Sequence, residues 1–277
     1  MADREPPFGA HAPQGLLARI LDITRALPSD GLGKRLGFAL RKLATPMLGG
    51  KPVDIESFGA RFRLMPYNNV CESRILFFPR LFDEAERDFI RSRMTDDFCF
   101  LDIGANIGGY SLFVAAHAGP RARIVAIEPM PDIFSRLVTN IRLNPFGTIK
   151  ALALAVADKD EERTLFVDRA NQGESSLKIV TAVESHSIRV PARRLLTILG
   201  EEGFAKLDGI KIDVEGAEDL ILDTFFSQAP ESLYPRIIVI ESAPNRWQSD
   251  LVGLLRSKGY MKVGETRNNY LFERNLG

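Results

Sequence analysis

Apolar and polar positions follow two different rhythms through the second half of the chain. Short runs that are apolar at consecutive residues, such as FCFLDIG at 98–104 and ARIVAIEP at 122–129, are each followed by a segment whose apolar residues recur every three or four positions. A strand that is apolar on both faces belongs to a sheet covered by helices on both sides. Alternation of such strands with helices is typical of a parallel sheet. The pattern therefore predicts an α/β fold with a doubly wound, mostly parallel, seven-stranded sheet.

The same pattern assigns the individual elements of this sheet. The parallel strands are predicted at 98–104, 122–129, 149–158, 208–216 and 235–244. The helices between them are predicted at 107–117, 132–142, 217–226 and 248–258. Residues 260–264 and 269–273 are expected to complete the sheet as a final pair of strands.

The first 95 residues have a different pattern, and we predict that residues 1–95 form an N-terminal extension to a domain of residues 96–277. Residues 1–14 are polar and rich in proline, which predicts a disordered tail. Two helical patterns follow, separated by the Pro-Ser-Asp-Gly sequence at 28–31. A hairpin around Gly59 is predicted at 53–65, and a further helix at 83–94.

The second helical pattern, which Pro46 is expected to kink or to end early, has two interpretations. Its apolar residues are Leu32, Leu36, Leu40, Leu43 and Met47, and its basic residues, largely on the opposite face, are Lys34, Arg35, Arg41 and Lys42. One interpretation is a helix that binds a membrane surface or a partner. The other is a helix that packs on its own domain and leaves a basic face in solvent. The second is favoured, because every surface helix is amphipathic.

Composition narrows the class of function. The 277 residues include 36 Lys+Arg and 36 Asp+Glu, and this neutral balance argues against a protein that mainly binds nucleic acid. The two cysteines, Cys71 and Cys99, are too few for a disulfide framework and fit a reducing compartment. No signal-peptide pattern and no apolar stretch of about 20 residues is present. We therefore expect a cytoplasmic chain without a transmembrane segment.

The first strand of the sheet leads into a turn that is suited to binding a ligand. Asp102 lies at the end of the strand, and Gly104 and Gly108 follow in the turn, where a ligand binds in doubly wound sheets. A dinucleotide site needs the pattern G-x-G-x-x-G, but Asn106 stands where the middle glycine is required. Asp102 would also repel a pyrophosphate. The turn therefore favours S-adenosylmethionine (SAM), which has no phosphate and carries a positive sulfonium and ammonium, over NAD.

The second strand ends on another carboxylate, Glu128, followed by Pro129. An acid at this place can accept hydrogen bonds from both hydroxyls of a ribose. Each of these residues also has a structural interpretation, because Asp102 can cap the next helix and Glu128 can be an ordinary surface residue. Their common register with Gly104 and Gly108 favours a site.

Three segments of the chain resemble the FkbM family of SAM-dependent methyltransferases: DIGANIGGYS, IEPMPDIF and KIDVEGAE. The resemblance extends over residues 97–273. It implies a Rossmann-like class I methyltransferase sheet, SAM as cofactor, and transfer of a methyl group to a hydroxyl of a sugar, glycan or natural product. The SAM-binding residues that it implies are Asp102, Gly104, Ala105, Asn106, Gly108, Glu128, Pro129 and Asp158. It also puts a polar loop at 171–177 near the substrate entrance.

For Asp158 the resemblance implies a contact with the adenine amine. Its carboxylate would accept a hydrogen bond from that amine. A turn aspartate in the hydrophilic sequence DKDEE is an equally good interpretation.

Charged residues in the fourth and fifth strands are the candidates for catalysis. Lys211 and Asp213 lie two residues apart in a strand that is otherwise apolar, so they share a face. Buried charges of this kind pair with each other or line a site. The resemblance implies that the end of this strand faces the methyl group, so Asp213 and Glu215 are predicted to orient or deprotonate the acceptor hydroxyl. Glu241, which matches an acid of the family, is predicted to contact the substrate or the charged groups of the active site. The competing interpretations are a Lys211–Asp213 pair that only stabilises the end of the sheet, and a helix N-terminal role for Glu241.

The acids and the fold also allow different chemistry. Asp213, Glu215 and Glu241 could together hold a hard cation, but no histidine joins them at ligand spacing, so no metal is predicted. The family often has a Leu-Asp pair where this chain has Leu195-Leu196, which keeps open a SAM-binding protein with impaired catalysis. Two further hypotheses are a NAD-dependent oxidoreductase and an RNA or protein methyltransferase. The missing basic excess disfavours RNA, and no N/D-P-P-Y tetrapeptide of amine methylation is present.

Overall fold

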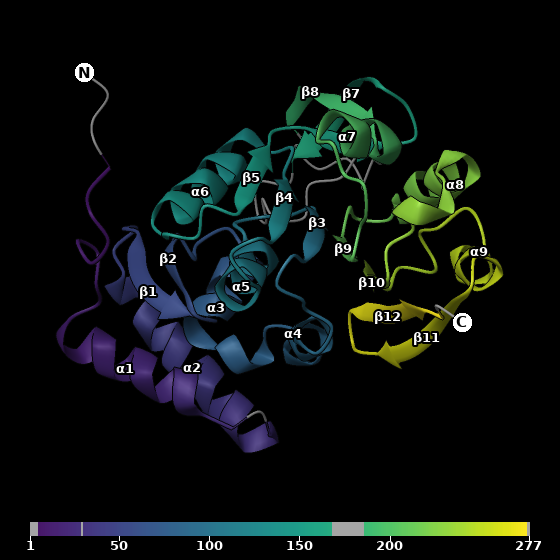
Figure 1. The fold of residues 1–277 in the computed structure, drawn as a ribbon. Helices are drawn as coiled ribbons and strands as arrows, with labels where there is room; N and C mark the ends of the chain where they lie inside the picture. The colour runs from purple at the N-terminus through teal and green to yellow at the C-terminus, as the bar shows by residue number, and fades with distance from the viewer. Residues whose placement is uncertain (1–4, 29, 168–185, 276–277) are drawn as a thin grey trace.

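The computed structural model describes residues 5–28, 30–167 and 186–275, and its centre is a seven-stranded sheet (Figure 1). The strands lie in the order β11-β12-β10-β9-β3-β4-β5. Five of them are parallel neighbours, namely β10 (Ile237–Glu241), β9 (Gly209–Ile212), β3 (Cys99–Ile103), β4 (Arg123–Ile127) and β5 (Ile149–Leu152). The antiparallel strands β12 (Asn269–Arg274) and β11 (Tyr260–Glu265) complete one edge. The predicted doubly wound, mostly parallel sheet is confirmed.

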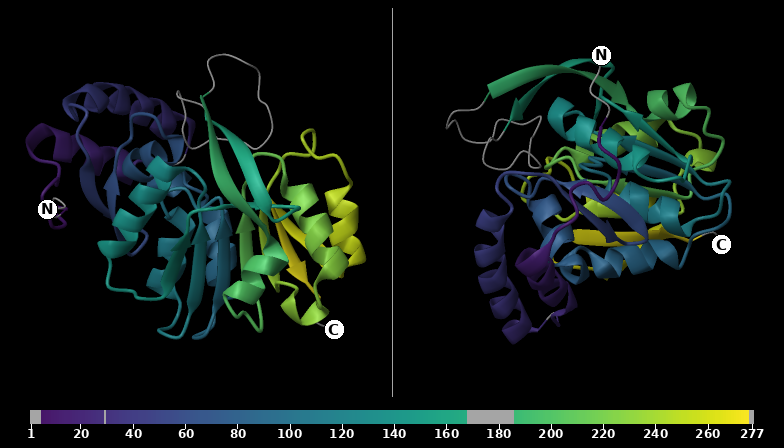
Figure 2. Two further views of the ribbon diagram at one scale, coloured as in Figure 1. Left: turned by 90° about the horizontal axis from the view of Figure 1, so that it is seen from above. Right: turned by 90° about the vertical axis from the view of Figure 1, so that its left-hand side faces the viewer.

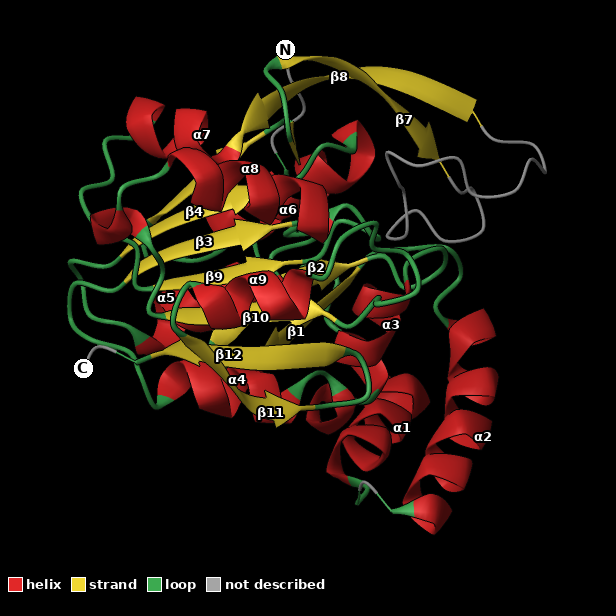
Figure 3. Cartoon of the chain, turned by 90° about the vertical axis from the view of Figure 1, so that its right-hand side faces the viewer, coloured by secondary structure: helices red, strands yellow, loops and turns green. Residues whose placement is uncertain are grey.

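Both faces of the sheet are covered by helices, because alternate strand residues point to opposite sides. Phe98 and Phe100 belong to one hydrophobic cluster, and Cys99, Leu101 and Ile103 belong to another. The first cluster includes residues of α4 (Glu84–Arg91), α5 (Gly109–His117) and α6 (Pro131–Arg142). The second includes residues of α7 (Leu195–Glu201), α8 (Glu218–Gln228) and α9 (Leu251–Ser257) (Figure 3).

The order of the strands fixes where a ligand can bind. From the central strand β3 the chain moves outward through β4 to β5, and it later returns to β9 on the other side of β3. The loops after β3 and β9 therefore leave in opposite directions and open a crevice between them. In open α/β sheets this topological switch point is where ligands bind.

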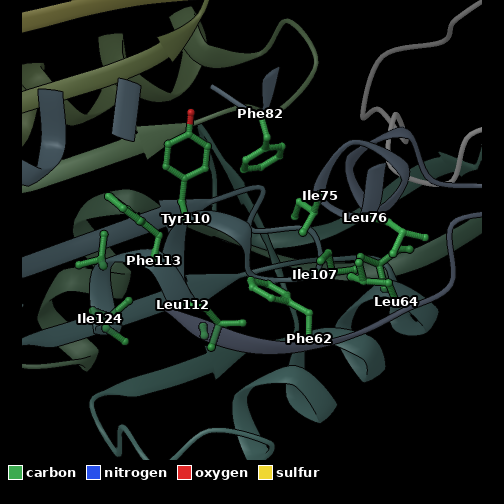
Figure 4. Close-up of a cluster of buried hydrophobic side chains, with 14 of the residues drawn as sticks. Phe62, Leu64, Ile75, Leu76, Phe82, Ile107, Tyr110, Leu112, Phe113 and Ile124 are labelled. Carbon is green, nitrogen blue, oxygen red and sulfur yellow. The ribbon is translucent and has the colours of Figure 1, made fainter. Parts of the chain in front are cut away.

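The N-terminal extension packs against the same face of the sheet as α5. Its elements are α1 (Gly15–Ala26), α2 (Gly31–Met47), the β1–β2 hairpin (Val53–Ser57 and Ala60–Leu64), α3 (Val70–Phe77), the short 3₁₀ helix η1 (Pro79–Leu81) and α4, which is the helix predicted at 83–94. Figure 4 shows Phe62 and Leu64 of β2 and Ile75 of α3 in one cluster with Leu112 of α5 and Ile124 of β4. The predicted helix pair and hairpin are present. The boundary at residue 96 stays a prediction, and this cluster includes residues on both sides of it.

The predicted disordered tail is wrong for residues 5–14. A buried ion pair in the hairpin holds this segment: the Arg63 Nε atom lies 2.8 Å from Asp54 Oδ1. The Arg63 guanidinium also donates to the carbonyl oxygens of Pro6 and Pro7, at 3.0 and 3.1 Å. A second oxygen of Asp54 accepts from the backbone N–H of Gly9 at 2.8 Å. A buried charge pair needs such additional hydrogen bonds, and the tail backbone supplies them.

The single strand predicted at 149–158 is also wrong. The chain forms β5 up to Leu152 and then β6 (Ala155–Ala157), which joins a separate three-stranded sheet. In that sheet β6 pairs with β8 (His186–Arg194), and β8 pairs with β7 (Glu161–Val167) (Figure 2). The run ALALAVA is uniformly apolar, so periodicity does not reveal the break at Leu154. The polar loop predicted at 171–177 lies outside the described residues.

Smaller differences concern helices. The structure adds α3 and α7, which the apolar pattern did not predict, and the 3₁₀ helix η3 (Glu231–Leu233). Helix α2 continues through Pro46 to Met47, with Asp30 as its N-cap, whose side chain accepts from Gly33 N at 2.7 Å. None of the described helices combines the length and the apolar character that crossing a membrane requires.

Candidate active site

A cavity of about 290 Å³ lies at the carboxyl ends of β3, β4, β9 and β10. It brings together ten of the twelve residues predicted for the site, which come from four different strand ends. These ten are Asp102, Gly104, Ala105, Asn106, Glu128, Pro129, Lys211, Asp213, Glu215 and Glu241. The cavity coincides with the topological switch point between β3 and β9.

Two of the twelve predicted residues do not line this cavity. Gly108 is the N-cap of α5 with φ of 91°, and a Cβ atom there would lie 2.8 Å from a methyl carbon of Leu137. Asp158 forms an ion pair with Arg163, whose Nη2 lies 2.8 Å from Asp158 Oδ1. The SAM-binding roles of Gly108 and Asp158 stay predictions.

The turn after β3 requires glycine at its first position. Gly104 has φ of 75°, and a Cβ atom there would lie 1.9 Å from the carbonyl oxygen of Asp213. Glycine therefore allows the turn after β3 to approach the end of β9 directly. The backbone N–H groups of Gly104 and Ala105 both donate to the carbonyl oxygen of Ile127, at 3.0 and 2.9 Å. The loops after three neighbouring strands are thus held in contact.

Asp102 is buried at the floor of the cavity. Its Oδ2 atom accepts two hydrogen bonds from Ser111, from the backbone N–H at 2.9 Å and from the hydroxyl at 2.6 Å. Asp102 therefore caps the first turn of α5, as its alternative structural role predicted, and it also lines the cavity. Burial raises the pKa of Asp102, and the hydrogen bonds from Ser111 oppose that shift.

Glu128 lies at the end of β4 with both carboxylate oxygens directed at backbone donors. Oε2 accepts from Asn106 N and Oε1 accepts from Met130 N, both at 2.9 Å. Burial raises the pKa of Glu128 to about 7, although both backbone hydrogen bonds act in the opposite direction. A carboxylate has about four acceptor positions, so two remain for a ligand in the cavity.

Lys211 and Asp213 form the ion pair that their spacing predicts. Lys211 Nζ lies 2.8 Å from Asp213 Oδ2, and only 3% of Lys211 is exposed. The ammonium also lies 5.3 Å from the ring centroid of Tyr110, whose hydroxyl donates to Asp83 Oδ2 at 3.0 Å. Burial lowers the pKa of Lys211, but its contacts with Asp213 outweigh burial and the net shift is upward. Lys211 is therefore a fixed positive charge that orients the Asp213 carboxylate.

The acids after β9 and β10 form a compact cluster beside this pair. One oxygen each of Asp213, Glu215 and Glu241 lies within 4.8 Å of the others, a spacing that a hard cation could bridge. Arg246 already supplies positive charge there, since its Nη1 lies 2.7 Å from Glu215 and 3.8 Å from Glu241. Burial, reinforced by the carboxylates of Asp213 and Glu215, raises the pKa of Glu241 to about 8.

The N-terminal extension contributes cavity residues that the sequence did not reveal. They are Asn69, Val70, Cys71 and Arg74 from the start of α3, and Phe82 and Asp83 before α4. Asn69 Nδ2 donates to the side-chain oxygen of Asn106 at 2.8 Å, which ties α3 to the turn after β3. No motif marks these residues, because only the tertiary fold brings them to the sheet edge.

Backbone strain is concentrated around the cavity. Among the described residues, four that are not glycine have positive φ, and three of them, Asp83, Asn106 and Glu215, line the cavity. Such conformations cost about 1–3 kcal/mol each and cluster at functional sites. This clustering supports a functional role for the cavity independently of the predicted motif.

Comparison with known proteins agrees with this geometry. The family model "Methyltransferase FkbM domain" matches residues 102–262. "AMB antimetabolite synthetase AmbE" of Pseudomonas aeruginosa is 32% identical over 163 residues, which are 46% of this chain and 8% of that protein. "Methyltransferase sdnD" of Sordaria araneosa is 24% identical over 216 residues, which are 63% of this chain and 82% of that protein.

Solved structures of similar fold include a "Methyltransferase FkbM" from Methylobacillus flagellatus KT. It is 16% identical with a TM-score of 0.40, and the match covers 92% of this chain and 57% of that one. RNA methylases are also among the structures of similar fold.

Proposed function

Because the chain belongs to the FkbM methyltransferase family, which uses SAM as cofactor, we propose that it transfers the methyl group of SAM to a hydroxyl oxygen of a small molecule or glycan. The observation that supports this proposal most is the group of carboxylates around the cavity at the β3–β9 switch point. A carboxylate can take the proton of a hydroxyl acceptor. Asp213, paired with Lys211 at 2.8 Å, is the proposed base.

The residues of the cavity fit the chemistry of SAM. The buried carboxylate of Asp102 provides negative potential for a sulfonium and an ammonium. The two remaining acceptor positions of Glu128 suit the hydroxyls of a ribose. The apolar side chains of Val156 and Leu165 line the same cavity and offer a surface for the adenine ring.

The proposed reaction depends mainly on alignment. Bound SAM supplies an electrophilic methyl group on sulfur. The protein must hold the acceptor oxygen about 3 Å from that methyl and in line with the sulfur, and such positioning can supply roughly 7–11 kcal/mol. Asp213 would receive the acceptor's proton as the new C–O bond forms and the C–S bond breaks. Lys211 would position Asp213 through their ion pair.

Competing functions have less support from the site. NAD is disfavoured by Asn106 and by the buried Asp102 beside the turn. An RNA acceptor is disfavoured by the neutral charge of the chain. The relative AmbE is an antimetabolite synthetase, and this supports a small-molecule acceptor instead. Both cysteines are free thiols, which supports the proposed location in the cytoplasm.

Leu195 and Leu196, which stand where the family often has a Leu-Asp pair, begin α7. A SAM-binding protein without turnover therefore remains the second candidate.

The proposed function is tested by two measurements on the full chain. Calorimetric titration with SAM, S-adenosylhomocysteine and NAD should show binding of the first two and none of NAD. Transfer of a radioactive methyl group from SAM should then be followed for sugars, other hydroxylated small molecules and RNA. Binding of NAD without binding of SAM would contradict SAM as the cofactor of this chain. SAM binding without transfer to any hydroxyl would favour the binding protein, and transfer only to RNA would contradict the proposed acceptor class.

Arg74 is the residue that we propose for the carboxylate of SAM. Arg74 lines the cavity, and its guanidinium makes no hydrogen bond or ion pair with the described residues, although its charge acts on the nearby carboxylate of Asp83. The other positively charged residue that lines the cavity, Lys211 of β9, already forms an ion pair with Asp213. A guanidinium binds a carboxylate through two parallel hydrogen bonds, so Arg74 is the better partner.

We expect Arg74→Gln to weaken the binding of SAM by about tenfold, the effect of roughly 1.4 kcal/mol. Binding of decarboxylated SAM, which lacks the carboxylate, should be the same in the variant and the wild type. Calorimetry with both compounds on both proteins measures this difference directly. Arg80→Gln is the matched control, because Arg80 is exposed and does not line this cavity. An equal loss for the two compounds would show that Arg74 does not recognise the carboxylate.

A further inference from the structure

The helix pair α1–α2 exposes most of the large apolar side chains found on the surface of the described chain. Eleven large hydrophobic residues are exposed there, and seven of them lie on these two helices. The seven are Leu16, Ile23, Leu32, Leu36, Phe38, Leu43 and Met47. Single exposed apolar residues are normal, but a cluster on one element marks an interaction surface.

Helix α2 buries its small residues and exposes three of its four leucines, Leu32, Leu36 and Leu43, while Leu40 packs partly on the core. The three buried residues of α2 are Gly33, Gly37 and Ala44. A Cβ atom at Gly37 would lie 2.5 Å from the ring of Phe78, so this face is in close contact with the protein and has no room for a larger side chain. A helix that served only its own core would bury its leucines. Leu32, Leu36 and Leu43 are therefore available to something outside the chain.

The exposed apolar residues of α2 form a stripe along the helix. Leu32, Leu36, Leu43 and Met47 follow one another at spacings of four, seven and four residues, which places them on one side. Their exposed fractions are 78%, 47%, 57% and 42%. The stripe extends from the first to the last turn of the helix, so a flat apolar surface could contact all four residues together.

The same helix is basic and has no compensating acid. It carries Lys34, Arg35, Arg41 and Lys42, and residues 31–47 contain no Asp or Glu. Lys34, Arg35 and Lys42 are exposed and have no ion pair in the described part of the chain. The whole chain has a formal net charge of +0, so this positive charge is a local feature of the helix pair.

We infer that α1 and α2 dock the protein on the surface of an anionic lipid bilayer. A helix with an exposed apolar stripe and a basic polar face is the combination that binds such a surface, because the apolar side chains enter the interface and the long cationic side chains reach lipid phosphates. Figures 1 and 3 both show α1 and α2 at the periphery of the molecule.

A second copy of the chain fits this surface less well. A symmetric dimer would place the same patch of each subunit face to face, and the unpaired cations of α2 would then oppose one another. A bilayer that contains acidic lipids supplies both the apolar layer and the opposite charge. The membrane surface is therefore the occupant that matches both properties of the helix pair.

Co-sedimentation of the full chain with lipid vesicles tests this inference without SAM or an acceptor. We expect binding to vesicles of phosphatidylcholine mixed with phosphatidylglycerol, and at least about tenfold weaker binding to phosphatidylcholine alone or at high salt. The double variant Leu36→Ser/Leu43→Ser should lose most of this binding. Both residues are exposed, so the variant should unfold at the wild-type temperature. A charge variant, Lys34→Gln/Lys42→Gln, should show a clearly smaller preference for the acidic vesicles than the wild type, because it loses two of the four cations of α2.

The matched control replaces exposed apolar residues elsewhere. Met261 and Val263 of β11 are 55% and 46% exposed, and Met261→Ser/Val263→Ser should bind acidic vesicles as the wild type does. Binding that is the same for Leu36→Ser/Leu43→Ser and the wild type would overturn the inference, as would no binding to either vesicle. Light scattering that shows a dimer in the wild type and a monomer in the leucine variant would assign the surface to a second copy instead.

Discussion

Replacing Asp213 by asparagine is expected to lower the rate of methyl transfer by about 10²–10⁴-fold, the contribution of a positioned general base. Asparagine keeps the shape of the side chain but does not accept a proton. SAM affinity should change much less, because Glu128 and the turn after β3 would still hold the donor. The measurement is kcat with the acceptor that the transfer assay identifies, together with the Kd for SAM from calorimetry.

The control for this variant is Asp97→Asn. Asp97 is exposed before β3, where it pairs with Lys206 at 2.9 Å, so its loss should leave kcat unchanged. The unfolding temperature of Asp213→Asn must also be measured, because the change leaves the buried Lys211 ammonium without its partner and so destabilises the fold. If kcat were unchanged while stability fell, Asp213 would serve only to stabilise the end of the sheet. An equally large loss of SAM affinity would assign Asp213 to the donor.

The arrangement of the strand-end residues could be predicted because a parallel sheet converts sequence position into spatial position. Asp102 is in register with Lys211 of β9 on one side and with Ala126 of β4 on the other. Residues that follow the same number of positions after these strands must therefore meet at one edge. That rule placed Glu128 and Asp213 beside the first turn without any knowledge of side-chain contacts.

The contribution of the N-terminal extension could not be predicted in this way. Arg74 and Asp83 reach the cavity because α3 and α4 pack on α5, and no local pattern states which helix faces which. The order of residues 5–14 also depends on a distant feature, the Asp54–Arg63 pair. The break between β5 and β6 was missed for the opposite reason, since a uniformly apolar run fits one long strand as well as two short ones. Strands β7 and β8, with the sequences EERTLFV and HSIRVPARR, lack such an apolar run and were missed as well.

Replacing Glu128 by glutamine is expected to weaken SAM binding by about 100-fold. A hydrogen bond to a charged group contributes about 1.5–3 kcal/mol, and each 1.4 kcal/mol is a factor of ten. The variant loses the charge, and its amide nitrogen would face a backbone N–H, either of Asn106 or of Met130, which now donates to the carboxylate. The exposed Glu56 gives the control, Glu56→Gln, which should bind SAM as the wild type does. Loss of affinity in both variants would point to a general effect of charge.

The pH dependence of SAM binding separates Glu128 from the other acids of the cavity. Burial raises the pKa of Glu128 to about 7 in the free protein, and the ligand favours the ionised form. SAM affinity should therefore be complete above about pH 7 and fall by up to tenfold for each unit below it, with release of a proton on binding near neutrality. Calorimetry across this range in two buffers of different ionisation enthalpy measures both effects, and Glu128→Gln should abolish them. If Glu241 controlled binding instead, the transition would lie near its pKa of about 8, and Glu241→Gln rather than Glu128→Gln would remove it.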